Sequence, residues 1–393
     1  MIGPRLFVLL APALFLLACQ GPPLRDQSTV FRYNESAGIS SLDPAFARNQ
    51  ANIWACNQLY NGLVQLDRNL QVQPALARRW EVLDSGRLYR FYLRPQVFFH
   101  RDSCFGPQET RSVIAQDFVF SLERLRNAEL AAPGAWVLQR VNRIEALNNL
   151  VLEIALKAPF PPFLSLLSMQ YCAVVPYEAV ERYGSDFGRR PVGTGPFAFK
   201  LWVENEKLVL RRHPHYFERD STGHALPYLE AVAVSFVPDK QTAFLEFLKG
   251  NLDLLSGLDA SYKDELLDVQ GQLRPRLAQR FKMYRQPYLN VEYLGFCLAD
   301  TAGKPWANRR VRQAINLCFD RSKMLRYLRN GVGRPAVRGM IPPGLPGFPD
   351  RSTYGYDYDP ERAASLLAEA GFPGGKGLSE IPLMTNDSYP GSL

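Results

Sequence analysis

The sequence lacks the short motifs on which common hydrolases and nucleotide-binding enzymes depend. It has no Gly-x-Ser-x-Gly nucleophile elbow and no His-Glu-x-x-His zinc helix. Lys376 follows a glycine, but Ala370 stands where a phosphate-binding loop has its first glycine, and Gly377 stands where it has Ser or Thr. The four histidines are too few to indicate a metal site by abundance. We therefore expect a protein that is not an enzyme and has no cofactor, and we keep a secreted hydrolase only as the weaker alternative.

Closely spaced cysteine pairs are also missing. Beyond Cys19 the sequence holds an odd number of cysteines, none in a Cys-x-x-Cys spacing: Cys56, Cys104, Cys172, Cys297 and Cys318. The pattern gives no support to a metal cluster or a redox pair. It leaves room for one or two disulfides in an oxidising compartment, although widely spaced cysteines in a large chain are more often small buried side chains.

Long hydrophobic runs are limited to the N-terminus. The apolar run 6–18 is too short to cross a bilayer as a helix, contains Pro12 and follows Arg5, which is typical of a signal peptide over residues 1–18. It ends in Leu-Leu-Ala-Cys19, which resembles the bacterial lipobox, in which the cysteine thiol receives a diacylglycerol. We therefore predict that Cys19 is the acylated first residue of a mature protein held at the membrane outside the cytoplasm. An uncleaved anchor and an ordinary secretory signal are the alternatives.

No continuous basic patch accompanies the formal net charge of +8. The arginines occur as isolated pairs such as Arg78-Arg79 and Arg309-Arg310, which favours a solvated basic surface over a nucleic-acid partner. Hydrophobic residues are 47% of the chain and charged residues 21%, a globular balance with enough length for two or three domains.

The periodic segments predict mixed α/β lobes. We expect strands over 29–33, 88–93, 150–156, 231–237 and 381–385, another strand entered at 251–254, and helices over 52–60, 115–125, 241–249 and from Pro360 to Ala370. Asp359 is suited to the N-cap of the last helix, Pro360 to its first position and Gly371 to the residue after its end. Pro191 to Phe197, with two prolines and two glycines, predicts a rigid crossover and a domain boundary.

Several landmarks occur in one order along the mature chain. They are Ser-Leu-Asp-Pro at 41–44, Leu-Tyr-Asn-Gly at 59–62, Pro-Ala-Leu-Ala at 74–77, Ala-Gln-Asp-Phe at 115–118, Pro-Val-Gly-Thr-Gly-Pro-Phe at 191–197, Tyr-Leu-Gly-Phe at 293–296 and Arg-Arg-Val-Arg-Gln-Ala-Ile-Asn at 309–316. Together they resemble the extracytoplasmic solute-binding proteins of family 5, which serve oligopeptide, dipeptide and nickel ABC importers.

The resemblance implies a class II periplasmic binding protein fold with three lobes. Lobe I would comprise 19–64 and 191–286, lobe II would be inserted as 65–190, and lobe III would occupy 287–393 and be incomplete, because relatives continue past this endpoint. The implied function is capture of a peptide by a monomer and its delivery to ABC permease subunits, in the periplasm or at the cell surface. Nickel, haem and oligosaccharides are the alternative ligands, because one fold serves several of them.

The ligand contacts are expected in a closing cleft that desolvates the peptide. The resemblance places the loop Asn34-Glu35-Ser36 on the cleft, where Glu35 could pair with a peptide amine. Tyr60, Tyr171 and Tyr293 are candidate pocket residues, although aromatic residues at such positions more often belong to the core. Gly193, Thr194 and Gly195 form the expected hinge, and a large side chain at Gly193 should disturb it if that glycine holds a positive φ. His213-Pro214-His215 is predicted to pack or cap rather than to bind a metal.

Overall fold

The computed structural model describes residues 29–259, 262–268, 271–285, 289–299, 302–328, 331–345, 348 and 355–384. The predicted signal peptide and Cys19 therefore lie outside the described residues. The chain divides into two compact units, Met1–Ser256 and Gly257–Leu393. No helix in the described ranges combines the length and apolarity that crossing a membrane requires.

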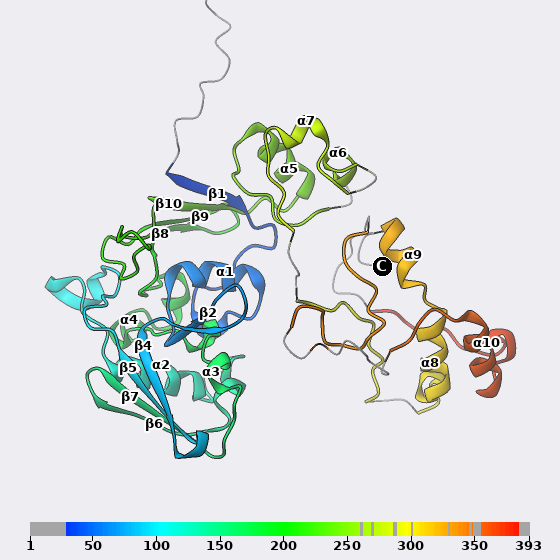
Figure 1. Ribbon diagram of the computed structural model, residues 1–393, viewed down its shortest axis with the longest axis horizontal. Helices are drawn as coiled ribbons and strands as arrows, with labels where there is room; N and C mark the ends of the chain where they lie inside the picture. Colours follow the sequence, from blue (N-terminus) through cyan, green and yellow to red (C-terminus); the bar gives the residue numbers. More distant parts are fainter. Residues whose placement is uncertain are drawn as a thin grey trace, which may run out of the picture. The chain divides into compact units, whose positions relative to one another are not determined.

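The first sheet of the N-terminal unit joins the start of the unit to its end. Its strands lie in the order β1-β10-β9-β8, with β1 and β10 parallel and the other neighbours antiparallel. The strands are β1 (Val30–Asn34), β8 (Phe197–Val203), β9 (Lys207–Arg212) and β10 (Ala231–Ser235). Val30 pairs with Ala231 and Asn34 with Ser235, so the carboxyl ends of the two parallel strands meet at one edge. Figure 1 shows these strands beside one another, above helix α1 (Gln50–Leu59).

A second four-stranded sheet, entirely antiparallel, is formed by the segment between β1 and β8. Its order is β4-β5-β7-β6. Buried and partly exposed residues alternate along β5, as expected for a sheet with one covered face, and helix α2 packs against β6 and β7. The elements are β4 (Ala77–Leu83), β5 (Leu88–Leu93), β6 (Val141–Asn148), β7 (Val151–Leu156) and α2 (Ala115–Arg126).

Shorter elements lie between the strands of the two sheets or follow the last strand. A hairpin is formed by β2 (Val64–Leu66) and β3 (Val72–Pro74). The other elements are η1 (Pro44–Phe46), η2 (Asp84–Gly86), η3 (Ser103–Gln108), η4 (Ala135–Leu138), α3 (Phe163–Leu166), η5 (Gln170–Cys172), α4 (Tyr177–Tyr183), η6 (Gly184–Arg189) and α5 (Lys240–Lys249). One continuous hydrophobic cluster extends through the unit and includes Tyr60, Phe91, Phe118 and Phe163.

The C-terminal unit has short helices and, in its described residues, no strand beyond an isolated bridge between Leu267 and Leu273. Helices α8 and α10 pack through a small cluster of Ala314, Ala363 and Leu366. The elements are α6 (Lys263–Leu266), α7 (Pro275–Ala278), η7 (Pro305–Ala307), α8 (Arg309–Cys318), α9 (Arg321–Leu328), α10 (Pro360–Glu369) and η8 (Pro373–Gly375). The Asp359 side chain accepts from the Arg362 N–H, Pro360 is the first helical residue and Gly371 has φ +93°, so this predicted helix is confirmed with its end signals.

Most strands and helices lie where the sequence predicts them, with two corrections. Ile381 to Met384 form no strand, and the remaining residue of that predicted strand lies outside the described residues. The segment after Asn251 contributes only an isolated parallel bridge between Leu254 and Tyr33, because the chain turns away after one residue. Gly193 does not have a positive φ. The lobe boundaries inferred from the resemblance remain a prediction.

The described cysteines are all free thiols. Cys56 and Cys172 are buried, Cys104 is half-buried, and Cys297 and Cys318 are exposed. The two buried thiols thus behave as the small core side chains that the sequence favoured.

Candidate functional site

The loop after β1 lies at the edge where the two parallel strands end. Ligands of open α/β sheets bind outside the carboxyl ends of parallel strands, because the backbone there is not yet covered by a connection. Asn34 is the last residue of β1, and Glu35 and Ser36 follow it half-buried. This edge is the candidate binding site.

The Asn34 side chain hydrogen-bonds to Ser235 and Val237, at and just beyond the end of β10. Its Nδ2 donates to the Val237 carbonyl at 2.9 Å, and its Oδ1 accepts from the Val237 N–H at 2.8 Å and from the Ser235 hydroxyl at 3.0 Å. The side-chain amide is therefore committed to the protein. Asn34 is better described as the residue that positions Glu35.

Glu35 has a half-buried carboxylate that, among the described residues, accepts a single long hydrogen bond. Its backbone N–H donates to the Ser235 carbonyl at 2.9 Å, while its Oε1 accepts from the Ala37 N–H at 3.3 Å. Burial raises the pKa of Glu35, and the hydrogen bond from Ala37 opposes this. Burial, together with the nearby Glu35 charge, raises the pKa of Tyr33 to about 12. A cation at this carboxylate would relieve the cost of burying its charge.

Trp54 adds an aromatic face near this edge that motif reasoning missed. It is half-buried on α1, and its ring lies 6.2 Å from the Tyr33 ring in an edge-to-face arrangement. The sequence showed Trp54 only as one apolar position of the predicted helix. Its neighbour on β1 comes from another part of the fold, which helical periodicity does not identify.

The three candidate tyrosines have different surroundings. Tyr60 is only 1% exposed, and its hydroxyl donates to the Leu42 carbonyl at 3.0 Å, so the expectation that it contacts ligand is corrected to a packing role. Tyr171 is half-buried against Gly134, where a Cβ would lie 2.2 Å from the tyrosine ring. Tyr293 belongs to the C-terminal unit and is 70% exposed. Tyr171 and Tyr293 remain predicted pocket residues.

The crossover lies against the C-terminal end of α1. A Cβ on Gly193 would lie 2.0 Å from the Leu59 carbonyl oxygen, and one on Gly195 would lie 2.4 Å from the Gln58 carbonyl oxygen. Thr194 is fully buried, and its hydroxyl donates to the Asn61 Oδ1 at 3.0 Å. The glycines are thus required by close backbone packing, not by a left-handed conformation.

A buried ion pair fixes the Ser41-to-Pro44 landmark to α2. The two Arg124 guanidinium nitrogens lie 3.1 and 2.5 Å from the carboxylate oxygens of Asp43, a bidentate pair. Asp43 also caps η1 by accepting from the Ala45 N–H at 3.0 Å. Removing the carboxylate would leave a largely buried guanidinium without its partner, so this landmark has a structural role.

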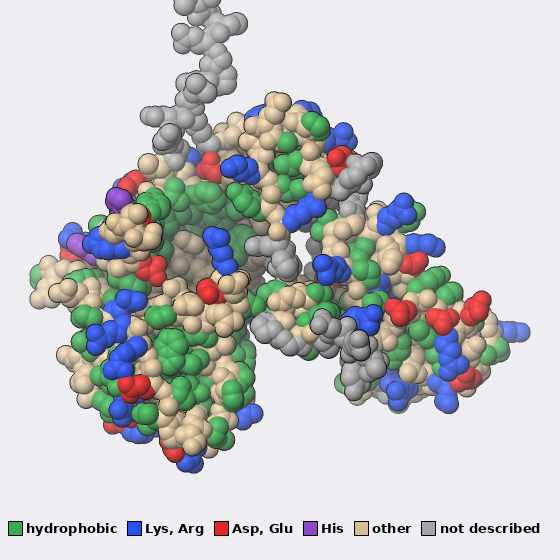
Figure 2. Space-filling model, viewed as in Figure 1, with side chains coloured by type: hydrophobic (Ala, Val, Ile, Leu, Met, Phe, Trp, Pro, Cys, Tyr) green, Lys and Arg blue, Asp and Glu red, His purple; other side chains and the backbone are tan. Residues whose placement is uncertain are grey.

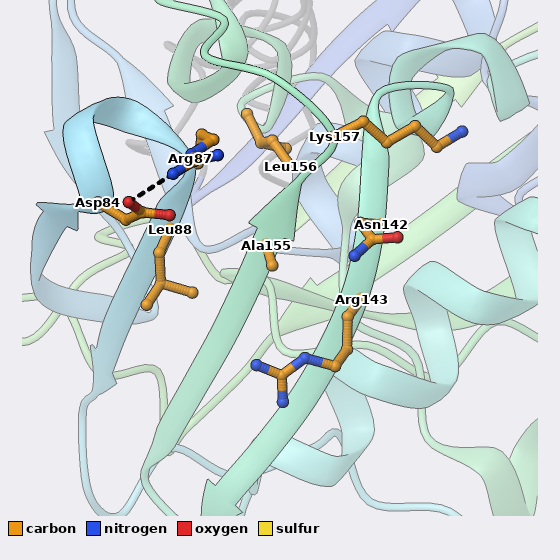
Figure 3. A pocket seen from close by; sticks show the side chains of 8 residues that line it. All are labelled: Asp84, Arg87, Leu88, Asn142, Arg143, Ala155, Leu156 and Lys157. Atoms are coloured by element: carbon orange, nitrogen blue, oxygen red, sulfur yellow. Dashed lines mark hydrogen bonds and ion pairs between the residues drawn. The ribbon is translucent and has the colours of Figure 1, made fainter.

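A separate depression of about 540 Å³ lies on the second sheet (Figure 3). It is lined by Asp84, Arg87, Leu88, Asn142, Arg143, Ala155, Leu156 and Lys157. Its cations already have partners, since Arg87 pairs with Asp84 at 2.9 Å and the Lys157 Nζ donates to the Gln139 carbonyl at 2.9 Å. Figure 3 shows the Lys157 and Arg143 side chains directed apart, so they do not converge on one ligand position.

On the face seen in Figure 2, basic and acidic side chains are interspersed.

The fold is that of the periplasmic binding proteins. The structure of the Helicobacter pylori ABC transporter-associated periplasmic binding protein DppA, in complex with the peptide STSA, superposes with a TM-score of 0.72 at 25% identity. The match covers 88% of this chain and 66% of that one. This correspondence confirms the fold class predicted from the sequence.

The sequence also matches a family model over residues 71–392. The chain belongs to the bacterial extracellular solute-binding proteins, family 5. It is 27% identical to heme-binding protein A of Haemophilus influenzae, over 93% of this chain and 68% of the relative. It is 26% identical to the glutathione-binding protein GsiB of Salmonella paratyphi A, over 86% of this chain and 61% of the relative. The chain thus spans 61% to 68% of the length of these two relatives.

Proposed function

We propose that this chain is the substrate-binding part of an ABC importer that captures peptides outside the cytoplasmic membrane and delivers them to permease subunits. The observation that carries the proposal is Glu35, a half-buried carboxylate at the carboxyl end of the parallel pair β1 and β10 in a family 5 protein. A peptide amine is the cation that suits such a carboxylate. The STSA peptide in the Helicobacter pylori neighbour supports the choice of ligand.

The test is calorimetric titration of the protein with the peptide Ser-Thr-Ser-Ala and with its N-acetylated form. We expect the free amine to be required, and Glu35→Gln to weaken binding by about 10- to 100-fold, because a partly desolvated charge pair is lost. Glu129→Gln, which removes an exposed carboxylate of the same unit, is the matched control and should leave binding unchanged. Equal affinity of wild type and Glu35→Gln for the free-amine peptide would show that Glu35 does not hold the amine.

The raised pKa of Glu35 also sets a pH dependence. Pairing with an amine needs the ionised carboxylate, so affinity should be complete above this pKa and fall as the pH decreases through it. Glu35→Gln should lack this component of the pH profile.

Haem is the second candidate ligand, because the Haemophilus influenzae relative is named as a heme-binding protein. Haem belongs in the same titration panel, with nickel and oligosaccharides. Binding of haem with no response to any peptide would replace the peptide proposal.

Capture without hydrolysis also predicts that the peptide is recovered intact after incubation with the protein, which mass spectrometry checks.

The predicted anchor is part of this proposal. Acylation at Cys19 would hold a monomeric binding protein at the membrane near its permease. Cys19→Ala should release the protein from the membrane fraction, whereas Cys297→Ala, which alters an exposed cysteine of the C-terminal unit, should not. An intact Met1 in the mature protein would contradict the anchor.

A further inference from the structure

Two buried histidines from distant parts of the N-terminal unit meet at the crossover. His100 and His213 are 2% and 4% exposed, and their rings lie 4.8 Å apart in an edge-to-face arrangement. Both are within hydrogen-bonding distance of the Gly195 carbonyl oxygen, His100 through Nε2 at 3.0 Å and His213 through Nδ1 at 3.2 Å. Two imidazoles therefore hold one backbone oxygen of the expected hinge.

The geometry defines the protonation state of His100. A carbonyl oxygen only accepts, so the Nε2 that contacts Gly195 carries a hydrogen. Nδ1 faces the Gly193 N–H at 3.3 Å and must accept, which requires an unprotonated nitrogen. The backbone N–H of His100 donates to the Gly193 carbonyl at 2.7 Å as well. His100 thus makes three hydrogen bonds to the crossover, and one of them exists only in the neutral ring.

The surroundings offer little to stabilise a positive charge. Among the described residues, the titratable group that lowers the pKa of His100 is His213, and the one that lowers the pKa of His213 is His215, whose ring lies 6.3 Å away. Arg101, next to His100 in the chain, is exposed and pairs with Glu109. The Tyr216 hydroxyl, three residues beyond His213, accepts from the Asn61 Nδ2, and burial together with the Glu218 charge raises the pKa of Tyr216.

Burial accordingly favours the neutral rings. Desolvation and the neighbouring histidine lower the pKa of His100 from 6.5 to about 3, and desolvation lowers that of His213 to about 4. A base whose pKa is depressed in the folded state stabilises that state fully only above its unfolded value. The stabilisation is lost as the pH falls from about 6.5 toward about 3 or 4.

We propose that His100 and His213 are positioning residues that hold the Gly193–Gly195 crossover only while they are neutral, so that acid loosens the crossover and weakens solute capture. Protonation of His100 would place a second N–H against the Gly193 N–H, replacing a hydrogen bond with donor–donor repulsion. Any state that exposes the rings to water removes that conflict and binds the proton. The effect on solute capture rests on the proposed function, whereas the effect on the crossover does not.

The experiment compares the full-length wild type with His100→Gln and His224→Gln at pH 7.5 and pH 5.0. Gln retains an N–H donor for Gly195 but does not titrate, and His224 is an exposed histidine outside the cluster, which makes it the matched control. Urea unfolding without ligand reports on the crossover. Each buried histidine should raise the unfolding equilibrium constant by about tenfold per pH unit below its unfolded pKa, or about 30-fold at pH 5.0. His100→Gln should remove one such factor, and His224→Gln should not.

The outcomes separate the two levels of the inference. Equal acid destabilisation of wild type and His100→Gln would overturn the histidine mechanism whatever the ligand is. If His100→Gln fails to fold, NMR titration of the wild-type rings replaces it, and a His100 ring that protonates in the folded protein above pH 5 overturns the proposal. In the ligand arm, the Ser-Thr-Ser-Ala affinity of Glu35→Gln and His100→Gln is compared at both pH values. If His100→Gln loses as much peptide affinity at pH 5.0 as the wild type does, the link between the histidines and capture is removed. If no peptide binds at either pH, the result counts against the proposed function alone.

Discussion

The two units differ in how completely they bury their apolar side chains. In the N-terminal unit, Phe91, Phe118 and Phe163 are fully buried in one continuous cluster that draws on both sheets. In the C-terminal unit, the α8–α10 cluster contains three small or medium side chains, while Tyr284 and Met384 are 84% and 95% exposed. Because buried apolar area is the main favourable term in folding, we expect the N-terminal unit to be the more stable.

The largest expected effect comes from filling the contact between the crossover and α1. Gly193→Val should destabilise the N-terminal unit by about 4 kcal/mol or more, because its Cβ meets rigid backbone rather than a flexible side chain. Urea unfolding followed by far-UV circular dichroism measures this. Gly62→Ala, whose Cβ would have ordinary contacts starting at 3.4 Å, is the control and should cost much less. Comparable losses for the two variants would show that the crossover is not tightly held.

A matched pair of carboxylates compares the units directly. In the N-terminal unit, Arg111 donates to Asp117 at 2.8 and 2.7 Å, and Asp117 is 2% exposed. Asp117→Asn should cost about 2 kcal/mol, because the partly buried guanidinium loses one of its two partner charges, the other being Glu178. In the C-terminal unit, Glu369 accepts from Arg310 and Arg362 at the surface, so Glu369→Gln should cost at most about 1 kcal/mol. The prediction is wrong if chemical denaturation gives the two variants equal losses.

The smallest effect is a difference in the rate of local opening. Limited proteolysis of the wild type should cut the chain after about Asn290 before it cuts the N-terminal unit, since sparsely packed segments open more often. Mass spectrometry of the early fragments identifies the cleavage sites. A first cut inside either sheet of the N-terminal unit would contradict the expectation that this unit is the more stable of the two.

The sequence by itself determined the elements whose signals are local. The last helix follows from its N-cap Asp359, its first-turn Pro360 and the glycine after its end, because each acts within a few residues of the helix terminus. Helices α1, α2 and α5 and the strands β1, β5, β7 and β10 follow from periodicity for the same reason. The ordered landmarks led to the family, which the family model confirms.

Only the tertiary structure decided what those elements bring together. Asn34 was predicted to line the cleft, but its amide is committed to Val237, more than two hundred residues away in the chain. Tyr60 was a pocket candidate and is a core residue, while the glycines of the crossover meet the α1 carbonyls. His100 and His213 share the Gly195 oxygen, although neither stood out as its partner in the sequence. Burial and long-range hydrogen bonds depend on which segments pack against each other, and a periodic pattern records only that a face is apolar.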